Sequence, residues 1–253
     1  MTTPLVNYKD VTDSEVQLYN DLGYLMLPGF LNATFLESLK EEALSNLEHS
    51  GITRESLYNA TTTGDKLRQC SKYLAGSELD RLINSPRTLN VASRLIGGKA
   101  CRYLPFTAVK SAGGGEFHLH QDNNYTCHSP VFGSINIWVA FVDMMPENGC
   151  LQMIPYSQKD GTLPSKNAGD GDGHQTIDVA LPDPVPIRMR AGDAVAFTRA
   201  TVHGSGSNQT SEPRIAYALQ YHRDDVSYID PESGESRLLT EDQRWDTEPL
   251  DCF

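Results

Sequence analysis

The sequence predicts a mainly β fold, a barrel or sandwich of short strands with α-helices packed outside it. Between about residues 13 and 98, apolar side chains recur at helical spacing behind capping residues. From about residue 101 to 225, short runs of aromatic and β-branched residues alternate with turn residues. We expect one domain over residues 1–253, in which a helical part precedes a strand-rich core and residues 226–253 form an extended surface tail.

Three helices are expected in the helical part. The first spans residues 14–21 behind Asp13, whose carboxylate can cap the free N–H groups of the first turn. A short strand is expected at residues 24–27. The second helix follows Asn32 and carries a stripe of apolar residues. The third starts at Pro86, because proline suits the first position of a helix, where its missing N–H is not needed.

The strand-rich core contains the segments that carry β-branched and aromatic residues. The expected strands are Arg102–Val109, Phe117–Gln121, Ser134–Val142, Cys150–Ile154, Thr176–Ala180, Val185–Met189, Ala194–Phe197 and Arg214–His222. Asn148-Gly149 predicts a tight hairpin turn into the fourth of these strands. Residues 156–176 are rich in Gly, Asp and Lys and predict a long loop, either a lid over a site or a plain surface loop. Residues 50–77 are polar and give no clear prediction.

Composition limits the partners of this chain. It has 253 residues, a formal net charge of −12 and a computed pI of about 4.9. Such a surface repels phosphate backbones and anionic membranes, so we expect neither nucleic acid nor membrane as a partner. No apolar run is long enough to span a bilayer, and no signal-peptide pattern is present at the N-terminus. The five cysteines are scattered and lack CxxC spacing, which favours reduced thiols and a cytoplasmic location. The oligomeric state is not indicated.

The segment Phe117-His118-Leu119-His120-Gln121-Asp122 contains candidate metal ligands. In an extended strand, side chains two positions apart share a face, so His120 and Asp122 are expected to project together. His203, which follows an apolar strand, is the best candidate for a third ligand. Two histidines and one carboxylate with open positions opposite are the ligands of non-haem Fe(II) oxygenases. We therefore expect iron on His120, Asp122 and His203.

Arg214 is a candidate for an anion-binding residue. It lies eleven residues after His203 and opens the apolar strand that runs to Leu219. Burying an arginine without an anion is unfavourable, and its planar fork suits a carboxylate. A dicarboxylate such as 2-oxoglutarate could chelate the metal with one end and pair with Arg214 through the other. A surface arginine paired with Asp or Glu is the alternative.

The ordered set of short motifs resembles the phytanoyl-CoA dioxygenase family of Fe(II)- and 2-oxoglutarate-dependent oxygenases. The matching segments are Asn20–Phe30, His120-Gln121-Asp122, Trp138, Glu147–Leu151, Ile154–Lys159, Ala191–Val195, His203–Gly206, Asn208 and Arg214. The resemblance implies a double-stranded β-helix, or jelly-roll barrel, with flanking helices, and a reaction that uses Fe(II), 2-oxoglutarate and O2. It also implies iron on His120, Asp122 and His203, the far carboxylate of the cosubstrate on Arg214, and a cosubstrate pocket lined by Trp138 and Phe106.

The chain departs from the family pattern at two positions. The family usually has Gly and His where this chain has Tyr156 and Gln158. Both lie outside the candidate metal site, so we expect altered loop packing rather than lost chemistry. Asp122 is retained. Related halogenases have a small residue at that position, which makes room for chloride, so the carboxylate favours oxygenation over halogenation.

Side chains near the candidate metal site suggest the class of substrate. The residues expected around the substrate are His118, Asn124, Tyr125, Gln152 and Arg102. Such polar and aromatic groups suit a small polar molecule, such as an amino acid or a natural-product intermediate. We expect hydroxylation of an unactivated C–H bond, or desaturation or cyclisation. The alternatives are a cupin-like metalloenzyme that does not use 2-oxoglutarate and a catalytically silent binding protein of the same fold.

Overall fold

The computed structural model describes residues 3–8, 10–60, 67–71, 73–169 and 173–240. The α-helices in these residues are α1 Asp13–Leu22, α2 Leu36–His49, α3 Glu78–Ile83, α4 Pro86–Ile96 and α5 Asn123–Thr126. The first eight strands are β1 Tyr24–Leu27, β2 Arg68–Cys70, β3 Ala100–Arg102, β4 Phe106–Lys110, β5 Phe117–His120, β6 His128–Ser129, β7 Ser134–Ala140 and β8 Leu151–Met153. The other strands are β9 Ser165–Asn167, β10 Gln175–Ile177, β11 Val185–Pro186, β12 Ala194–Thr198, β13 His203–Ser205, β14 Arg214–Arg223, β15 Ser227–Ile229 and β16 Ser236–Leu238.

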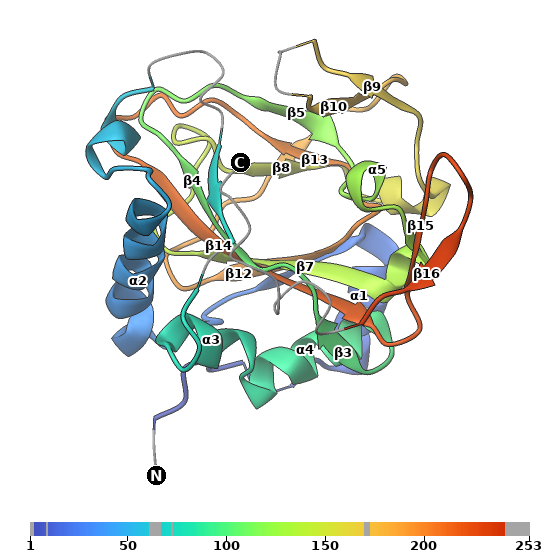
Figure 1. Cartoon of the computed structure of the whole chain (residues 1–253), viewed down its shortest axis with the longest axis horizontal. Helices are drawn as coiled ribbons and strands as arrows, with labels where there is room; N and C mark the ends of the chain where they lie inside the picture. Colours follow the sequence, from blue (N-terminus) through green and yellow to red (C-terminus); the bar gives the residue numbers. More distant parts are fainter. Residues whose placement is uncertain (1–2, 9, 61–66, 72, 170–172, 241–253) are drawn as a thin grey trace.

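Two antiparallel sheets face each other and form the body of the fold (Figure 1). The major sheet has the order β1-β12-β7-β14-β4-β2, with β3 also paired to β14, and the minor sheet has the order β11-β8-β13-β5. Helices α2, α3 and α4 lie along the outer face of the major sheet, opposite the minor sheet (Figure 1). Neighbouring strands are mostly far apart in sequence, as in a jelly roll. The predicted fold class, mainly β with flanking helices, is confirmed.

The major sheet is buried on both faces, and its two faces have different partners. In β7, Ile135, Ile137 and Val139 belong to the apolar cluster that the helices complete. Trp138 and Ala140 belong to the cluster between the two sheets. The alternation follows from the two-residue period of a strand, which sends neighbouring side chains to opposite faces. Polar residues on the inward face of the major sheet therefore point into the space between the sheets.

The ends of α1 and α4 show which residues set the helix boundaries. Thr12, rather than Asp13 as predicted, caps α1: its hydroxyl accepts from Glu15 N, and the Glu15 side chain bonds back to Thr12. This is a capping box, which satisfies two otherwise free donors. Gly23 ends α1 with φ 86°, a conformation that favours glycine. Pro86 opens α4 as predicted.

Two strand predictions in the core need correction. The expected strand Arg102–Val109 is divided into β3 and β4, because Pro105 lies between them and cannot donate to a sheet. The expected hairpin at Asn148-Gly149 is wrong, since β7 belongs to the major sheet and β8 to the minor sheet. The segment still turns tightly: Asn148 Oδ1 accepts from Met145 N at 2.8 Å, and Gly149 has φ 72°. The turn carries the chain from one sheet to the other.

The predicted loop and the predicted tail both contain regular structure. Residues 157–160 form a 3-10 helix. Strand β9 lies inside the predicted loop 156–176 and pairs with β10, which begins inside that loop and ends one residue after it. In the expected tail, β15 and β16 form a hairpin, and β15 pairs with β6. The tail is therefore not extended over residues 227–238. Trp245 and Phe253, considered as anchors for the tail, lie outside the described residues. None of the described helices has the length and apolar composition needed to cross a bilayer.

Tyr156 has a left-handed backbone conformation, which we expect to lower the stability of the fold. It has φ 68° and an exposed side chain, and it stands where the family usually has glycine. A left-handed conformation costs a non-glycine residue about 1–2 kcal/mol. We expect Tyr156→Gly to raise the free energy of unfolding by roughly 0.5–1 kcal/mol, because glycine also gains freedom in the unfolded chain. Urea denaturation measures this difference, and a loss of stability would contradict the assignment of strain.

Candidate metal centre

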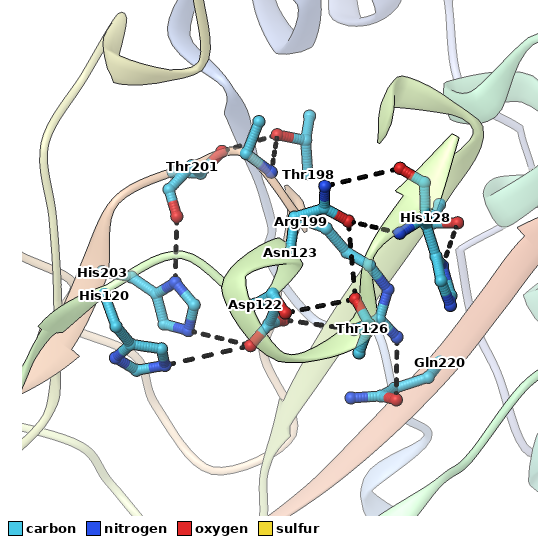
Figure 2. Close-up of polar contacts among 12 residues, drawn as sticks. His120, Asp122, Asn123, Thr126, His128, Thr198, Arg199, Thr201, His203 and Gln220 are labelled. Carbon is cyan, nitrogen blue, oxygen red and sulfur yellow. Dashed lines mark hydrogen bonds and ion pairs between the residues drawn. The ribbon is translucent and has the colours of Figure 1, made fainter. Parts of the chain in front are cut away.

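Three side chains that can bind a metal converge at the inner end of the minor sheet. His120 ends β5, His203 begins β13, and the two residues are opposite partners in the sheet. Asp122 stands just before α5, after the chain has left the strand. Asp122 Oδ1 lies 3.9 Å from His120 Nε2 and 3.6 Å from His203 Nε2 (Figure 2). One ligand atom from each residue fits within 4.8 Å of the others, so the group could hold a metal ion.

The orientation of both imidazoles leaves the same nitrogen free for a metal. His120 Nδ1 is 2.8 Å from the His118 carbonyl oxygen, and His203 Nδ1 is 3.0 Å from the Thr201 carbonyl oxygen. A carbonyl can only accept, so each Nδ1 carries the proton and each Nε2 offers its lone pair. Backbone partners of this kind commonly orient metal-binding histidines. The donor set of two imidazoles and a carboxylate fits Fe(II).

The protonation states also suit a cation. Burial, reinforced by His203, lowers the pKa of His120 from 6.5 to about 3, so that this imidazole is neutral near pH 7. Burial acts to raise the pKa of Asp122, but His203 and Arg199 outweigh it and hold the pKa below its usual value. The site therefore presents a neutral imidazole at His120 and a carboxylate at Asp122 without needing the metal to displace protons from them.

The lowered pKa of His120 predicts a pH-dependent stability in the metal-free protein. Between about pH 6.5 and 3 the unfolded chain binds a proton that the folded imidazole does not, so folding weakens as the pH falls through this window. Above about pH 6.5 this contribution is constant. We expect the free energy of unfolding of wild-type protein to fall more steeply between pH 7 and 5 than that of His120→Asn. Equal slopes in urea denaturation would show that His120 is not buried in neutral form.

A cavity opens beside the three donors. His120, Asp122, His203 and Arg214 all line it. The apolar part of the wall consists of Leu67, Phe106, Phe117, Trp138 and Leu151. The remaining lining residues are Gln69, Asn136, Gly204 and Ser205. An apolar wall that carries several polar groups is typical of a site for a small molecule.

Arg214 is a buried cation with unused donors. Its side chain is 0% exposed, and Nη1 donates a 2.8 Å hydrogen bond to the Gly149 carbonyl. Nε and Nη2 donate to no described residue, and the indole N–H of Trp138 is likewise without an acceptor there. The guanidinium carbon lies 5.3 Å from the centre of the Trp138 ring. Burial lowers the pKa of Arg214 to about 10, which still leaves it charged at pH 7. These donors fit the carboxylate of a ligand in the cavity.

The residues predicted to line the cosubstrate pocket do line the cavity, whereas His118, predicted to contact the substrate, does not. Phe106 and Trp138 line the cavity together, with ring centres 6.4 Å apart. His118 does not line it and instead faces Glu116, with His118 Nδ1 3.5 Å from a Glu116 carboxylate oxygen. The reason is a register shift between β5 and β13, after which Phe117 and His120 both face inward.

Of the other four predicted substrate residues, only Tyr125 contacts a metal-site residue. Its ring centre lies 5.7 Å from that of His120, and its hydroxyl accepts from Gln175 N. Asn124 Nδ2 donates to the Leu163 carbonyl. Gln152 and Arg102 do not line the cavity: the neighbours of Gln152 along β8 face inward, and Arg102 hydrogen-bonds to Tyr73.

Several cavity residues were not predicted from the sequence. Leu67 and Gln69 come from the segment 50–77, whose polar composition gave no signal for β2. Asn136 could have been found, because it shares the inward face of β7 with Trp138, two positions away. Phe117 and Leu151 each stand next to a predicted residue but on the opposite strand face, and Ser205 lies two positions after His203. The sequence contains no comparable signal for Arg199, whose charge lies behind Asp122.

Comparisons with known proteins show the family of this chain. Residues 19–216 match the family model described as phytanoyl-CoA dioxygenase (PhyH). The chain is 29% identical over 217 residues to a methylphosphonate hydroxylase of Gimesia maris, a match that covers 84% of this chain and 81% of the relative. It is 26% identical over 239 residues to an L-proline trans-4-hydroxylase of Streptomyces griseoviridis, which covers 83% and 86% of the two chains.

Solved structures show the same fold. The carbocyclase SnoK from nogalamycin biosynthesis superposes with a TM-score of 0.70 at 22% identity, covering 90% of this chain and 89% of that one. The epimerase SnoN, solved with Fe3+, α-ketoglutarate and nogalamycin RO, gives a TM-score of 0.68 at 25% identity and covers 94% of both chains. The family model spans most of the chain, and the cavity joins a two-histidine, one-carboxylate group to a buried arginine. The chain therefore belongs to the phytanoyl-CoA dioxygenase family and is an iron- and 2-oxoglutarate-dependent oxygenase.

Proposed function

We propose that this protein hydroxylates an unactivated C–H bond of a small polar molecule, with Fe(II) held by His120, Asp122 and His203. The observation that carries the proposal is one cavity lined by three metal donors and by a buried guanidinium with unused N–H groups. Buried polar groups without partners are unfavourable unless a ligand satisfies them. A dicarboxylate that reaches from the metal site to Arg214 meets both requirements.

Each group of residues has a distinct task in the proposed reaction. Arg214 and Trp138 bind the far carboxylate of 2-oxoglutarate and fix its orientation. The apolar wall at Phe106, Phe117 and Leu151 excludes water from the reacting atoms. When bound, Fe(II) supplies the oxidising chemistry with O2 and 2-oxoglutarate, and the protein supplies binding and orientation. The balanced reaction converts R–H, 2-oxoglutarate and O2 to R–OH, succinate and CO2.

The cavity and the relatives both favour a small polar substrate. The methylphosphonate and proline hydroxylases are named for small polar substrates. The polar groups on the cavity wall suit such molecules better than a long acyl chain. Asn136 and Gln69 on the wall offer polar partners for such a molecule. Asp122 supports oxygenation rather than halogenation, because it occupies the position that must be small in the halogenase relatives.

A substrate screen tests the proposal. Protein loaded anaerobically with Fe(II) is mixed with 2-oxoglutarate, O2 and one candidate, chosen from amino acids, small phosphonates and natural-product intermediates. We expect one class to stimulate succinate formation and to yield a product that has gained one oxygen atom. Loss of two hydrogens would show desaturation or cyclisation. Succinate formation at the same rate with every candidate and in Asp122→Ala would contradict the proposed function.

A further inference from the structure

Arg199 is a buried arginine that does not line the cavity and lies behind Asp122. It belongs to the turn between β12 and β13, and its side chain is 1% exposed. Nη2 donates a 2.9 Å hydrogen bond to Gln220 Oε1, and the guanidinium carbon lies 4.8 Å from the centre of the Tyr103 ring. These two contacts hold the guanidinium plane in one orientation. Figure 2 shows its other end directed at Asp122.

The two oxygens of Asp122 have different surroundings. Oδ1 faces both metal-binding imidazoles, at 3.9 Å from His120 Nε2 and 3.6 Å from His203 Nε2. Oδ2 is buried, accepts no hydrogen bond from the described residues, and lies 3.8 Å from Arg199 Nη1 (Figure 2). Arg199 is therefore the positive charge that faces the oxygen turned away from the imidazoles. Rotation of the carboxylate would move that oxygen away from its counter-charge.

The turn that carries Arg199 is anchored on several sides. The Thr201 hydroxyl donates to the Gly23 carbonyl at 2.6 Å and lies 3.0 Å from the Thr198 hydroxyl. The Arg199 carbonyl accepts from Asn123 N, the residue directly after Asp122. The Thr201 carbonyl accepts from His203 Nδ1. One turn thus contacts the backbone after one metal-binding residue and orients the side chain of another.

We propose that Arg199 is a positioning residue, which holds Asp122 with one oxygen directed at His120 and His203 before the metal arrives. The inference rests on the proposed function, because it takes Asp122 as a metal ligand. An arginine suits this task, since its planar fork can bond to Gln220 and face the carboxylate at the same time. Orienting partners of metal ligands commonly contribute a factor of about 10–100 to metal affinity.

The direction in which metal affinity changes when Arg199 is replaced separates a positioning role from a purely electrostatic one. Removing a positive charge near a cation site would by itself strengthen metal binding, because like charges repel. Removing a partner that orients the carboxylate weakens binding, because the carboxylate then adopts several orientations. The proposal predicts that the second effect is larger. Tighter metal binding after loss of the charge would overturn it.

Calorimetric titration with Mn(II), which replaces Fe(II) without reacting with O2, measures this effect directly. We expect Arg199→Met to weaken Mn(II) binding about 10- to 100-fold. Arg199→Lys keeps the charge and should bind more tightly than Arg199→Met. In an Asp122→Ala background, Arg199→Met should change Mn(II) affinity by less than about twofold, because independent effects add and Arg199 then has no ligand to orient. Equal losses in both backgrounds would show a merely structural role.

Two controls complete the design. Arg54→Met makes the same substitution at a half-exposed arginine that pairs with Glu41 and Glu48 on the helical part, and should leave Mn(II) affinity unchanged. If Arg199→Met does not fold, Arg199→Gln replaces it, since glutamine also removes the charge but keeps a polar group in the side chain. Wild-type protein that binds no Mn(II) would contradict both the proposed function and this inference. Wild-type binding with unchanged affinity in Arg199→Met would contradict the inference alone.

Discussion

Replacing Asp122 by alanine is expected to weaken Fe(II) binding by more than about 100-fold, because loss of a ligand must exceed the effect of losing an orienting partner. Asp122 supplies the carboxylate of the group, and its Oδ1 lies within 4 Å of both imidazole nitrogens. Substrate-stimulated succinate formation should fall to background in the same variant. Anaerobic calorimetry measures the first effect, and a coupled assay for succinate measures the second.

The matched control is Asp225→Ala. Asp225 is exposed and pairs with Arg223, so its loss removes a carboxylate without touching the cavity. A surface ion pair contributes little to stability, and this variant should bind Fe(II) and turn over like wild type. Retention of Fe(II) affinity and activity in Asp122→Ala would mean that the metal is held elsewhere. Thermal unfolding of both variants distinguishes ligand loss from loss of the fold.

Replacing Arg214 by methionine is expected to separate cosubstrate binding from metal binding. Truncating one partner of a buried charge pair costs about 2–5 kcal/mol. The dissociation constant of 2-oxoglutarate should therefore rise roughly 30- to 4000-fold. Fe(II) affinity should not fall, because Arg214 does not belong to the group of metal donors and its loss removes a positive charge from the cavity. Fluorescence or calorimetric titration of the metal-loaded protein with 2-oxoglutarate measures the change.

The same variant should be more stable than wild type in the absence of ligand. Arg214 is fully buried, and burial lowers its pKa to about 10, which shows that the folded protein disfavours the charge. Methionine removes that penalty and keeps much of the volume. A substitution that damaged the fold would lower both the stability and the 2-oxoglutarate affinity. Loss of a cation that serves only ligand binding lowers the affinity alone. A cupin-like enzyme that does not use 2-oxoglutarate would keep its activity in Arg214→Met.

The convergence of His120, Asp122 and His203 was predictable because these residue types stand in short, distinctive motifs. His120 and Asp122 are two positions apart, and His203 follows an apolar strand. Residue type and position in the sequence were therefore enough to select these three as candidate metal ligands. The two-residue period of a strand does not explain how His120 and Asp122 meet. Only His120 lies on β5, while Asp122 has φ −55° and ψ −31° at the start of α5. The two side chains meet because the chain turns, not because they share a strand face.

The substrate wall was not predictable for a related reason. Neighbouring residues in a strand face opposite ways, so an error of one position exchanges inside for outside. His118 was expected in the cavity, but a register shift in β5 places Phe117 there instead. Gln152 was also expected in the cavity, but its neighbour Leu151 lines it instead. β-Bulges and strand crossovers depend on tertiary pairing, and a single sequence carries little information about them.

Spectroscopic titration of the anaerobic Fe(II) protein with 2-oxoglutarate tests the central claim most directly, because it needs no knowledge of the substrate. A keto acid that chelates Fe(II) gives a metal-to-ligand charge-transfer band in the visible range. We predict that the band appears with wild-type protein, saturates at one equivalent of 2-oxoglutarate, and is absent from Asp122→Ala. A wild-type protein that binds Fe(II) and shows no such band at saturating 2-oxoglutarate would contradict the claim that His120, Asp122, His203 and Arg214 form one site for both ligands.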